Sequence, residues 1–227
     1  KYQKKEDLPL IQTLRDINIE LYFKACLYNL SESNKPYLKE YMISIMPLDF
    51  YSWKYKSFYT LVAAYHDDFS REIFDMAFSE DVNKRMQKYH VGFVYSAAKE
   101  YKDGFYDDYL KTLWLEYNLT DVDLIDYFLA KDKKFAIDAI KKSVKKSEVY
   151  FSNTKALDHM IKTLNINNVN LIDYFANGIK KSEVITFEVY MHNLDLIDIQ
   201  NKKIINAMKQ RLSKDTNQHV LFPLYEN

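Results

Sequence analysis

The sequence predicts an all-α protein, built as an irregular helical-hairpin repeat of the α-solenoid type, with a globular multi-helix bundle as the alternative. Only three glycines and four prolines occur in 227 residues, so the residues that tight β-hairpin turns need are scarce. Apolar side chains recur at helical spacing along most of the chain. A short motif also recurs in the second half. These three observations favour helices joined by short polar loops.

The composition predicts an aromatic-rich core. Hydrophobic residues make up 48% of the chain, and Phe, Trp and Tyr make up 16%. A chain of this length can bury about 70% of its unfolded surface without disulfides or metals. We therefore expect residues 1–227 to form a single domain, with 214–227 as a short C-terminal tail.

Apolar periodicity predicts twelve helices, and several have recognisable start signals. Pro36 suits a first helical turn, and Asp103 precedes an apolar stripe. Thr120 and Asp123 resemble a capping box with Asp in place of Glu. In chain order the helices are expected at 7–30, 35–46, 48–65, 69–78, 81–101, 104–118, 121–130, 133–146, 153–164, 168–177, 182–192 and 195–213.

The helix expected at 48–65 has an aromatic face and one aromatic residue outside that face. On a helical wheel, half the circle holds Phe50, Tyr51, Tyr55, Phe58, Tyr59, Leu61, Val62, Tyr65 and Phe69. Most of these rings are therefore predicted to be core. Trp53 lies off that arc beside Ser57 and Ala64, and small neighbours favour a second helix packing there. The alternative makes Trp53 an exposed anchor, and it is our candidate for binding a partner.

The second half contains two sequence elements that recur. NLTDVDLIDYF at 118–128 and NINNVNLIDYF at 165–175 are 47 residues apart, and a fainter copy, NLDLIDI, begins at Asn193. KKSEV occurs at 145–149 and 180–184, only 35 residues apart. The spacings disagree, and the signatures of ankyrin and tetratricopeptide repeats are absent. The sequence therefore predicts a degenerate helical-hairpin repeat, clearest over 118–213.

Two histidine motifs suggest metal sites, but neither is complete. His66 and Asp67 resemble the pair of metal-dependent phosphohydrolases, which need an earlier histidine, and none precedes His66. We expect His66 to be a surface residue at a helix end. Glu188 and His192 are four residues apart, rather than the three of a di-iron bundle.

Paired aspartates at 67–68 and 107–108 suggest the DDxxD pattern that holds magnesium. The fifth position is Arg71 in one and Lys111 in the other, and a cation there opposes metal binding. No glycine-rich loop is present to bind phosphate. We therefore expect no metal, no cofactor and no enzymatic activity, with a dispersed acidic site around 103–126 as a remaining alternative.

The window Lys131–Lys146 contains seven lysines and an apolar face of Ala136, Ile140 and Val144. A solvated helix end is one interpretation, because lysines in the last turns complement the helix dipole. Binding of phosphates or anionic lipid is the other. The candidate polyanion-binding residues are Lys141, Lys142, Lys145 and Lys146.

These observations favour a non-enzymatic protein that binds another protein, as helical repeats commonly do. The alternative is a helical module that binds nucleic acid or another polyanion through the C-terminal lysines. Only four arginines and a formal net charge of zero weigh against nucleic acid. The charge divides into −5 for residues 1–130 and +5 for residues 131–227, which allows salt-dependent self-association.

Cysteine content and hydropathy bear on localisation. The single cysteine, Cys26, lies in an apolar run, which favours a buried thiol and an intracellular, cytoplasmic protein over a nucleophile. The longest uncharged apolar run, Phe58 to Tyr65, is far shorter than the ~20 residues of a membrane span. Because the chain begins without methionine, we expect a processed or truncated form.

Overall fold

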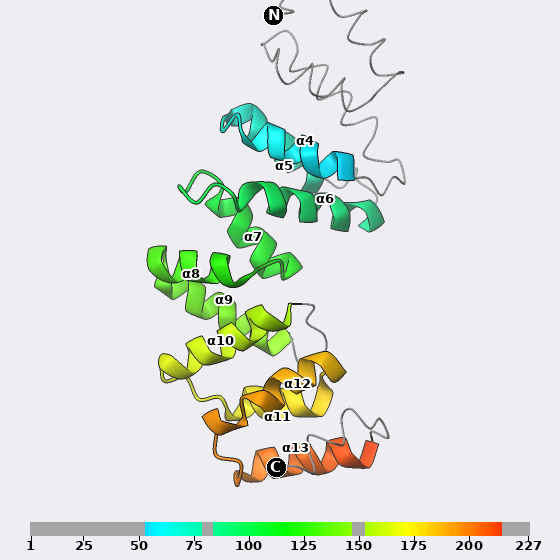
Figure 1. Ribbon diagram of the computed structural model, residues 1–227, viewed down its shortest axis with the longest axis vertical. Helices are drawn as coiled ribbons and strands as arrows, with labels where there is room; N and C mark the ends of the chain where they lie inside the picture. Colours follow the sequence, from blue (N-terminus) through cyan, green and yellow to red (C-terminus); the bar gives the residue numbers. More distant parts are fainter. Residues whose placement is uncertain (1–52, 79–83, 147–152, 215–227) are drawn as a thin grey trace, which may run out of the picture. The chain divides into compact units, whose positions relative to one another are not determined.

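The computed structural model describes residues 53–78, 84–146 and 153–214, and over these ranges the protein is all-α, as predicted. The two helices expected at 7–30 and 35–46 lie outside the described residues. Figure 1 shows the elements of the described ranges, which include no strand. They are α4 Trp53–Ala63, α5 Asp68–Phe78, α6 Lys84–Ala98, α7 Asp107–Tyr117, α8 Val122–Lys131, α9 Lys133–Lys146, α10 Thr154–Ile166, α11 Ile172–Lys181, α12 Val184–His192, the 3-10 helix η2 Leu194–Leu196 and α13 Lys202–Lys214.

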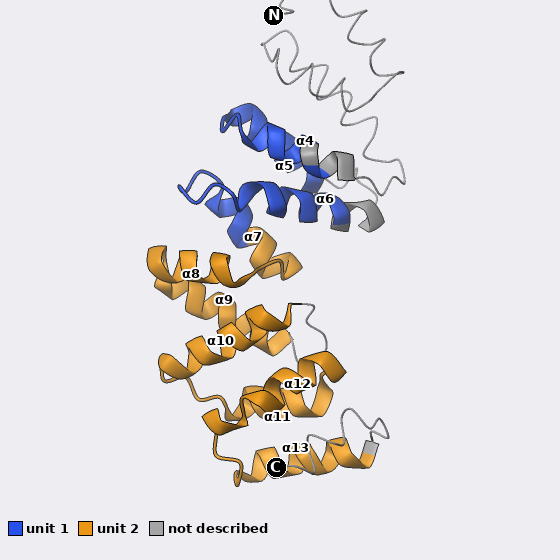
Figure 2. Ribbon diagram, in the orientation of Figure 1, with its two compact units in different colours: residues 1–111 blue, residues 112–227 orange. Residues whose placement is uncertain are grey.

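Contacts between helices divide the chain into two compact units, residues 1–111 and 112–227 (Figure 2). The boundary falls inside α7. The expectation of a single domain stays a prediction, as does the C-terminal tail, most of which lies outside the described residues. No helix in the described ranges is both long and apolar enough to span a bilayer.

Aromatic side chains form much of the core of the first unit. In this unit α4 packs on α5 and α6, and α5 packs on α6. Tyr59 of α4 is fully buried, and its ring contacts the rings of Phe58 and Phe74 at centroid distances of 5.8 and 6.1 Å. Phe74 in turn contacts Tyr106 at 5.0 Å. The prediction of an aromatic-rich core is therefore confirmed.

Helices that are close in sequence pack together in the second unit. There α8, α9 and α10 contact one another, and α11 contacts α9, α12 and α13. The predicted apolar face of α9 is confirmed, because Ala136, Ile140 and Val144 are all buried. The indole of Trp114 is also buried, and its ring lies 5.8 Å from that of Phe135. The core of this unit is thus formed by helices that are close to one another in the sequence.

Asp132 explains why α9 begins where the sequence predicts. Its backbone N–H donates to Phe128 O at 2.7 Å and ends α8, while its Oδ1 accepts from Phe135 N at 3.1 Å and starts α9. The start of α8 differs from the predicted capping box. Asp121, rather than Thr120, is the N-cap, and its side chain accepts from Leu124 N at 3.0 Å. Thr120 is instead buried.

Two other predicted boundaries were wrong. The helix expected at 168–177 begins later, at Ile172, because Asn168 has a φ of 57° and ends α10. The helix expected at 195–213 is broken into η2 and α13. Between them, Asp198 Oδ1 accepts from Gln200 N at 3.0 Å, and Asn201 Oδ1 accepts from Lys203 N at 3.0 Å.

The two copies of the LIDYF motif bury the same leucine and phenylalanine positions, although Ile125 is buried and Ile172 is only half-buried. Leu124 and Phe128 of α8 are buried, as are Leu171 and Phe175 at the matching positions around α11. The aspartate of each copy is exposed and pairs with a basic residue two helices further on. The pairs are Asp126 Oδ1 with His159 Nε2 at 2.7 Å and Asp173 Oδ1 with Lys203 Nζ at 2.6 Å.

Candidate functional site

The four candidate lysines lie in the last two turns of α9, but they have different surroundings. Lys146 Nζ donates to Leu115 O at 2.7 Å, and Lys141 Nζ lies 3.8 Å from Asp138 Oδ1. Among the described residues, no carboxylate lies within ion-pair distance of Lys142 or Lys145. These two lysines line different hollows on the surface. The structure therefore does not gather all four ammonium groups into one unpaired patch.

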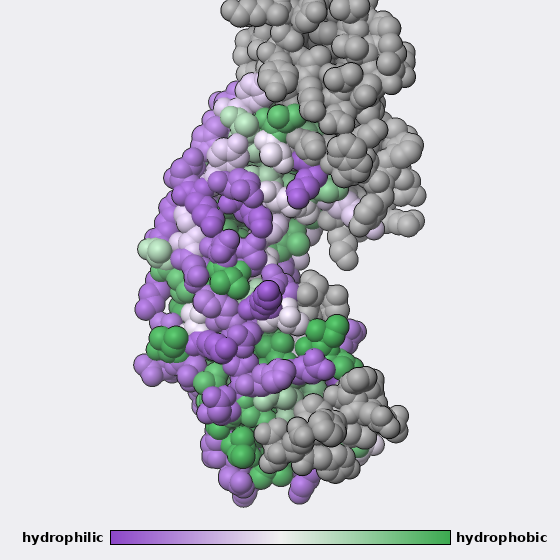
Figure 3. All heavy atoms as spheres, viewed as in Figure 1, coloured by the Kyte–Doolittle hydropathy of each residue, from purple (hydrophilic) through white to green (hydrophobic). Residues whose placement is uncertain are grey.

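Trp53, the other candidate, is the first residue of α4, but its side chain lies outside the described residues. Its role as an anchor stays a prediction. Other large apolar side chains do reach the surface of the second unit, namely Ile166, Ile185 and Ile199. On the described surface that Figure 3 shows, hydrophobic residues form several separate areas among hydrophilic ones. Apolar side chains on this face are thus dispersed.

A groove of about 420 Å³ lies between the end of α9 and the start of α11 in the second unit. We call it the α9/α11 groove. Among the described residues, six line this groove; five of them carry a polar or charged side chain, and three of these five come from α11. The lining residues are Val144, Lys145, Asn170, Asp173, Tyr174 and Asn177.

Buried contacts beneath the groove hold its two sides together. Val144 is 1% exposed, and its carbonyl accepts a hydrogen bond from the Tyr190 hydroxyl of α12 at 3.2 Å. The Tyr190 ring packs edge-on against Phe175 of α11 at 5.4 Å. Gly178 allows this approach, because a Cβ there would overlap the Tyr190 ring. The floor is therefore well packed and presents the polar rim from fixed helices.

The local structure of the chain determines which groups the rim offers. Asn170 Oδ1 accepts from Ile172 N at 3.0 Å, so Asn170 has its Nδ2 protons left to donate to a ligand. Tyr174 and Asn177 are three residues apart in α11, which places them on one face. Burial, and then the Asp173 carboxylate, raise the pKa of the Tyr174 phenol. That phenol is therefore a neutral donor at physiological pH.

The charges of the rim are unequal. Asp173 is the one carboxylate among the described residues that line the groove, and its Oδ1 lies 2.6 Å from Lys203 Nζ. Lys145 lines the opposite side and has no such counter-ion in the described part of the chain. The unbalanced charge of the described rim is therefore positive.

A second hollow, of about 440 Å³, lies beside α9 in the same unit and has a different character. Its lining combines apolar side chains with charges of both signs. The lining residues are Leu115, Asp132, Lys134, Phe135, Asp138, Ala139 and Lys142. Asp132 and Asp138 offset Lys134 and Lys142 here. The described lining of this hollow therefore lacks the unbalanced positive charge found in the α9/α11 groove.

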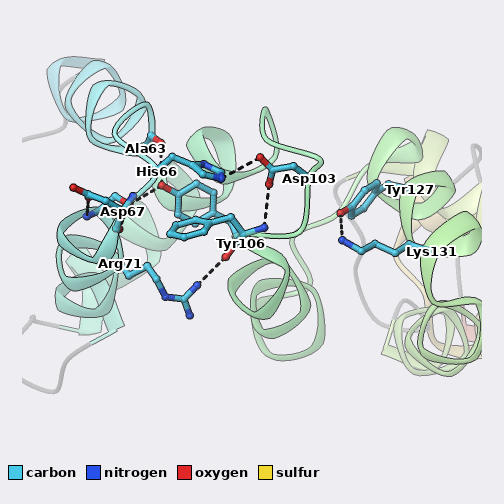
Figure 4. Close-up of polar contacts among 10 residues, drawn as sticks. Ala63, His66, Asp67, Arg71, Asp103, Tyr106, Tyr127 and Lys131 are labelled. Atoms are coloured by element: carbon cyan, nitrogen blue, oxygen red, sulfur yellow. Dashed lines mark hydrogen bonds and ion pairs between the residues drawn. The ribbon is translucent and has the colours of Figure 1, made fainter.

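His66 belongs to a polar and aromatic cluster in the first unit (Figure 4). It follows α4 with a φ of 55°, and its Nε2 lies 3.0 Å from Asp103 Oδ2. The imidazole packs against Phe105 at a centroid distance of 4.1 Å. Its Nδ1 is buried and has no hydrogen-bond partner among the described residues. His66 is thus half-buried near the end of α4, with its Nε2 paired with Asp103 and its Nδ1 buried.

Tyr106 forms the centre of the same cluster. Its hydroxyl lies 2.7 Å from Ser70 Oγ and 2.9 Å from Ala63 O, and the side chain is fully buried. Burial raises the pKa of Tyr106 to about 12, although the hydrogen bond with Ser70 acts in the opposite direction. These contacts join the end of α4 to α5 and to the segment before α7. The cluster has the character of a structural junction.

The paired aspartates form structural contacts. Asp67 Oδ1 accepts from Ser70 N at 3.0 Å at the start of α5. Asp108 pairs with Arg71, so the cation of one DDxxD-like pattern neutralises an acid of the other. Arg71 Nη1 also donates to Phe105 O at 2.8 Å. In the described ranges, no group of three His, Cys, Asp or Glu side chains is placed to hold a metal ion.

Comparisons with known protein families, with curated proteins and with solved structures find no match to this chain. The function is therefore inferred from the geometry of the α9/α11 groove.

Sequence reasoning selected Lys145 but missed the other polar residues of the groove. Asn170, Asp173 and Tyr174 lie within the second copy of the repeated motif, which was used only to predict the fold. The signal that distinguishes this copy is its asparagine content, since Asn170 replaces Asp123 of the first copy. Asn177 lies beyond the motif, and no local pattern identifies it.

Proposed function

We propose that this chain is a non-enzymatic helical-repeat protein that binds another protein, with the α9/α11 groove as the binding site. The observation that carries the proposal is the polar rim of this groove, with four side chains that can donate a hydrogen bond, presented over a packed floor. Side-chain amides can hydrogen-bond to the peptide groups of a bound segment. Fixed helices reduce the ordering cost of binding, because little of the site has to reorganise.

The relation between the two motif copies supports an irregular repeat of three helices, α8–α10 followed by α11–α13. Each copy buries the leucine and the phenylalanine of LIDYF. In each copy the aspartate pairs with the third helix of its unit, through His159 in one and Lys203 in the other. Stacked helical units of this kind present extended surfaces that commonly bind proteins.

Selection from a random peptide display library tests the proposed function. We expect the full chain to select peptides, and we expect Asn177→Ala to weaken their binding about tenfold, as one lost hydrogen bond at a binding site allows. The matched control is Asn206→Ala, an exposed asparagine of α13 that does not line the groove. Circular dichroism would show that both variants keep the helical fold.

Three outcomes would count against the proposal. Failure to select any peptide is one, and equal effects of the two asparagine variants is another. The third is binding of heparin or a single-stranded oligonucleotide that is tighter than that of any peptide. This last result would favour the alternative function of binding a polyanion, especially if Lys142 and Lys145 contributed equally to the affinity for the polyanion.

A further inference from the structure

The charges and hydrogen bonds of the α9/α11 groove indicate what kind of segment it binds. Resting on the proposed function, we propose that the groove takes an extended, acidic peptide segment of a partner protein. Backbone carbonyls of the segment would accept from Asn170 and Asn177, and a carboxylate would accept from Lys145.

Four of the described rim side chains can donate a hydrogen bond, namely Lys145, Asn170, Tyr174 and Asn177. Asn170 Oδ1 is used by Ile172 N, so its Nδ2 group remains. The phenol of Tyr174 is protonated at neutral pH, as an ordinary tyrosine is, and can donate. The ammonium group of Lys145 can only donate. A ligand rich in acceptors, such as peptide carbonyls and carboxylates, satisfies this set.

The carboxylate in the groove does not favour a basic ligand. Asp173 lies 2.6 Å from Lys203 Nζ, so its charge is already opposed by a cation of the protein. Lys145 has no carboxylate at ion-pair distance among the described residues. An acidic segment therefore gains a charge-assisted hydrogen bond at Lys145. A basic segment would be repelled by Lys145.

The spacing of lysines along α9 suits an extended segment. Lys141 and Lys145 are four residues apart and share one face of the helix, about 6 Å from each other along its axis. In an extended chain, alternate side chains on one face are about 7 Å apart. Acidic residues at alternate positions can therefore face both lysines. To bind such a segment, Lys141 has to give up its ion pair with Asp138. This ion pair is exposed and weak, because the two charged atoms are 3.8 Å apart.

Fluorescence anisotropy with three labelled peptides of equal length tests the inference. One carries Asp at alternate positions among small polar residues, one carries Asn at those positions, and one carries Lys. We expect the Asp peptide to bind at least about tenfold more tightly than the Asn peptide, with the difference shrinking at high salt. The Lys peptide should bind more weakly than either.

Two pairs of variants assign the effect to the groove. Lys145→Glu and Asn177→Asp each place a negative charge on the rim, and each should weaken binding of the Asp peptide about tenfold or more. Their controls, Lys155→Glu on α10 and Asn206→Asp on α13, change exposed residues that do not line the groove. The controls should change binding by less than about threefold, once melting curves show that all four variants are folded.

The outcomes separate this inference from the proposed function. Display peptides that bind the groove but show no acidic preference would overturn the inference and leave the proposed function standing. Equal losses for Lys145→Glu and Lys155→Glu would also overturn it, because they would indicate a non-specific response to net charge. Tighter binding of a single-stranded oligonucleotide than of the Asp peptide would reject both.

Discussion

The indole Nε1 of Trp114 on α7 donates a hydrogen bond to Ser143 Oγ on α9 at 2.9 Å, and both side chains are buried. Ser143→Ala should therefore lower the free energy of unfolding by about 1–3 kcal/mol, because the indole N–H would lose its partner inside the core. Urea unfolding followed by circular dichroism measures this. Ser213→Ala, an exposed serine of α13, should change it by less than about 0.5 kcal/mol. Similar losses in both variants would contradict the prediction.

Two glycines in helices should respond oppositely to alanine. A Cβ at Gly178 would overlap the buried ring of Tyr190, so Gly178→Ala should destabilise the protein by about 1–3 kcal/mol. At Gly92 of α6, no described atom lies within 4 Å of an added Cβ. Gly92→Ala should therefore stabilise the protein by about 0.5–1 kcal/mol. Thermal melting of both variants measures the difference, and a stabilised Gly178→Ala would show that the helices separate easily.

Alkaline titration should reveal two tyrosines of the first unit that lose their phenolic protons at unusually high pH. Burial raises the pKa of Tyr106 to about 12, and it also raises the pKa of Tyr109, whose hydroxyl lies 2.6 Å from Asp75 Oδ1. The folded protein then holds protons that the unfolded chain releases near pH 10. This stabilisation is complete below about pH 10 and is lost as the pH rises through about 12.

Ultraviolet absorbance of the phenolates, recorded during alkaline titration, measures this effect. Tyr106→Phe should remove one late-titrating group from the native curve. In urea, the tyrosines should titrate together near pH 10, whatever the variant. A native curve that coincides with the urea curve would disprove the prediction.

Asp158 should contribute to stability at neutral pH. Burial acts to raise its pKa, but hydrogen bonds from Lys162 Nζ and Asn193 Nδ2, both 2.8 Å long, outweigh it and hold the pKa below its ordinary value. This contribution is present above about pH 4 and is lost as the pH falls through the lower pKa of the folded state.

Asn193→Ala removes one of these hydrogen bonds and tests the acid effect. Asn193 is 2% exposed and also donates to Val189 O at 2.8 Å, so the loss at pH 7 should be about 1–3 kcal/mol. The loss should become smaller in acid, as Asp158 is protonated. Asn206→Ala on the exposed face of α13 is the control and should show neither change. If the loss of stability did not change with pH, Asn193 would act through its hydrogen bond to Val189 O alone, and the prediction for Asp158 would be wrong.

The sequence by itself was sufficient to predict the fold class, the start of α9 and the faces that are buried. Ala136, Ile140 and Val144 line the core because residues four apart lie on one side of any helix, whatever surrounds it. The same local rule placed Phe58 and Tyr59 in the core of the first unit. These features depend on the spacing of residues along one helix, and that spacing can be read directly from the sequence.

Tertiary structure decided where several helices begin and which residues meet. The side chains of Thr120 and Asp121 could each accept the capping hydrogen bond at the start of α8. Packing buries Thr120, and Asp121 caps the helix. Lys145, Asn170 and Asp173 line one groove, although 28 residues separate the first of them from the last. Their proximity depends on how α9, α11 and α12 pack, through contacts such as Tyr190 with the carbonyl of Val144. Local periodicity contains no information about such contacts, because many packings of the same helices satisfy the same apolar stripes.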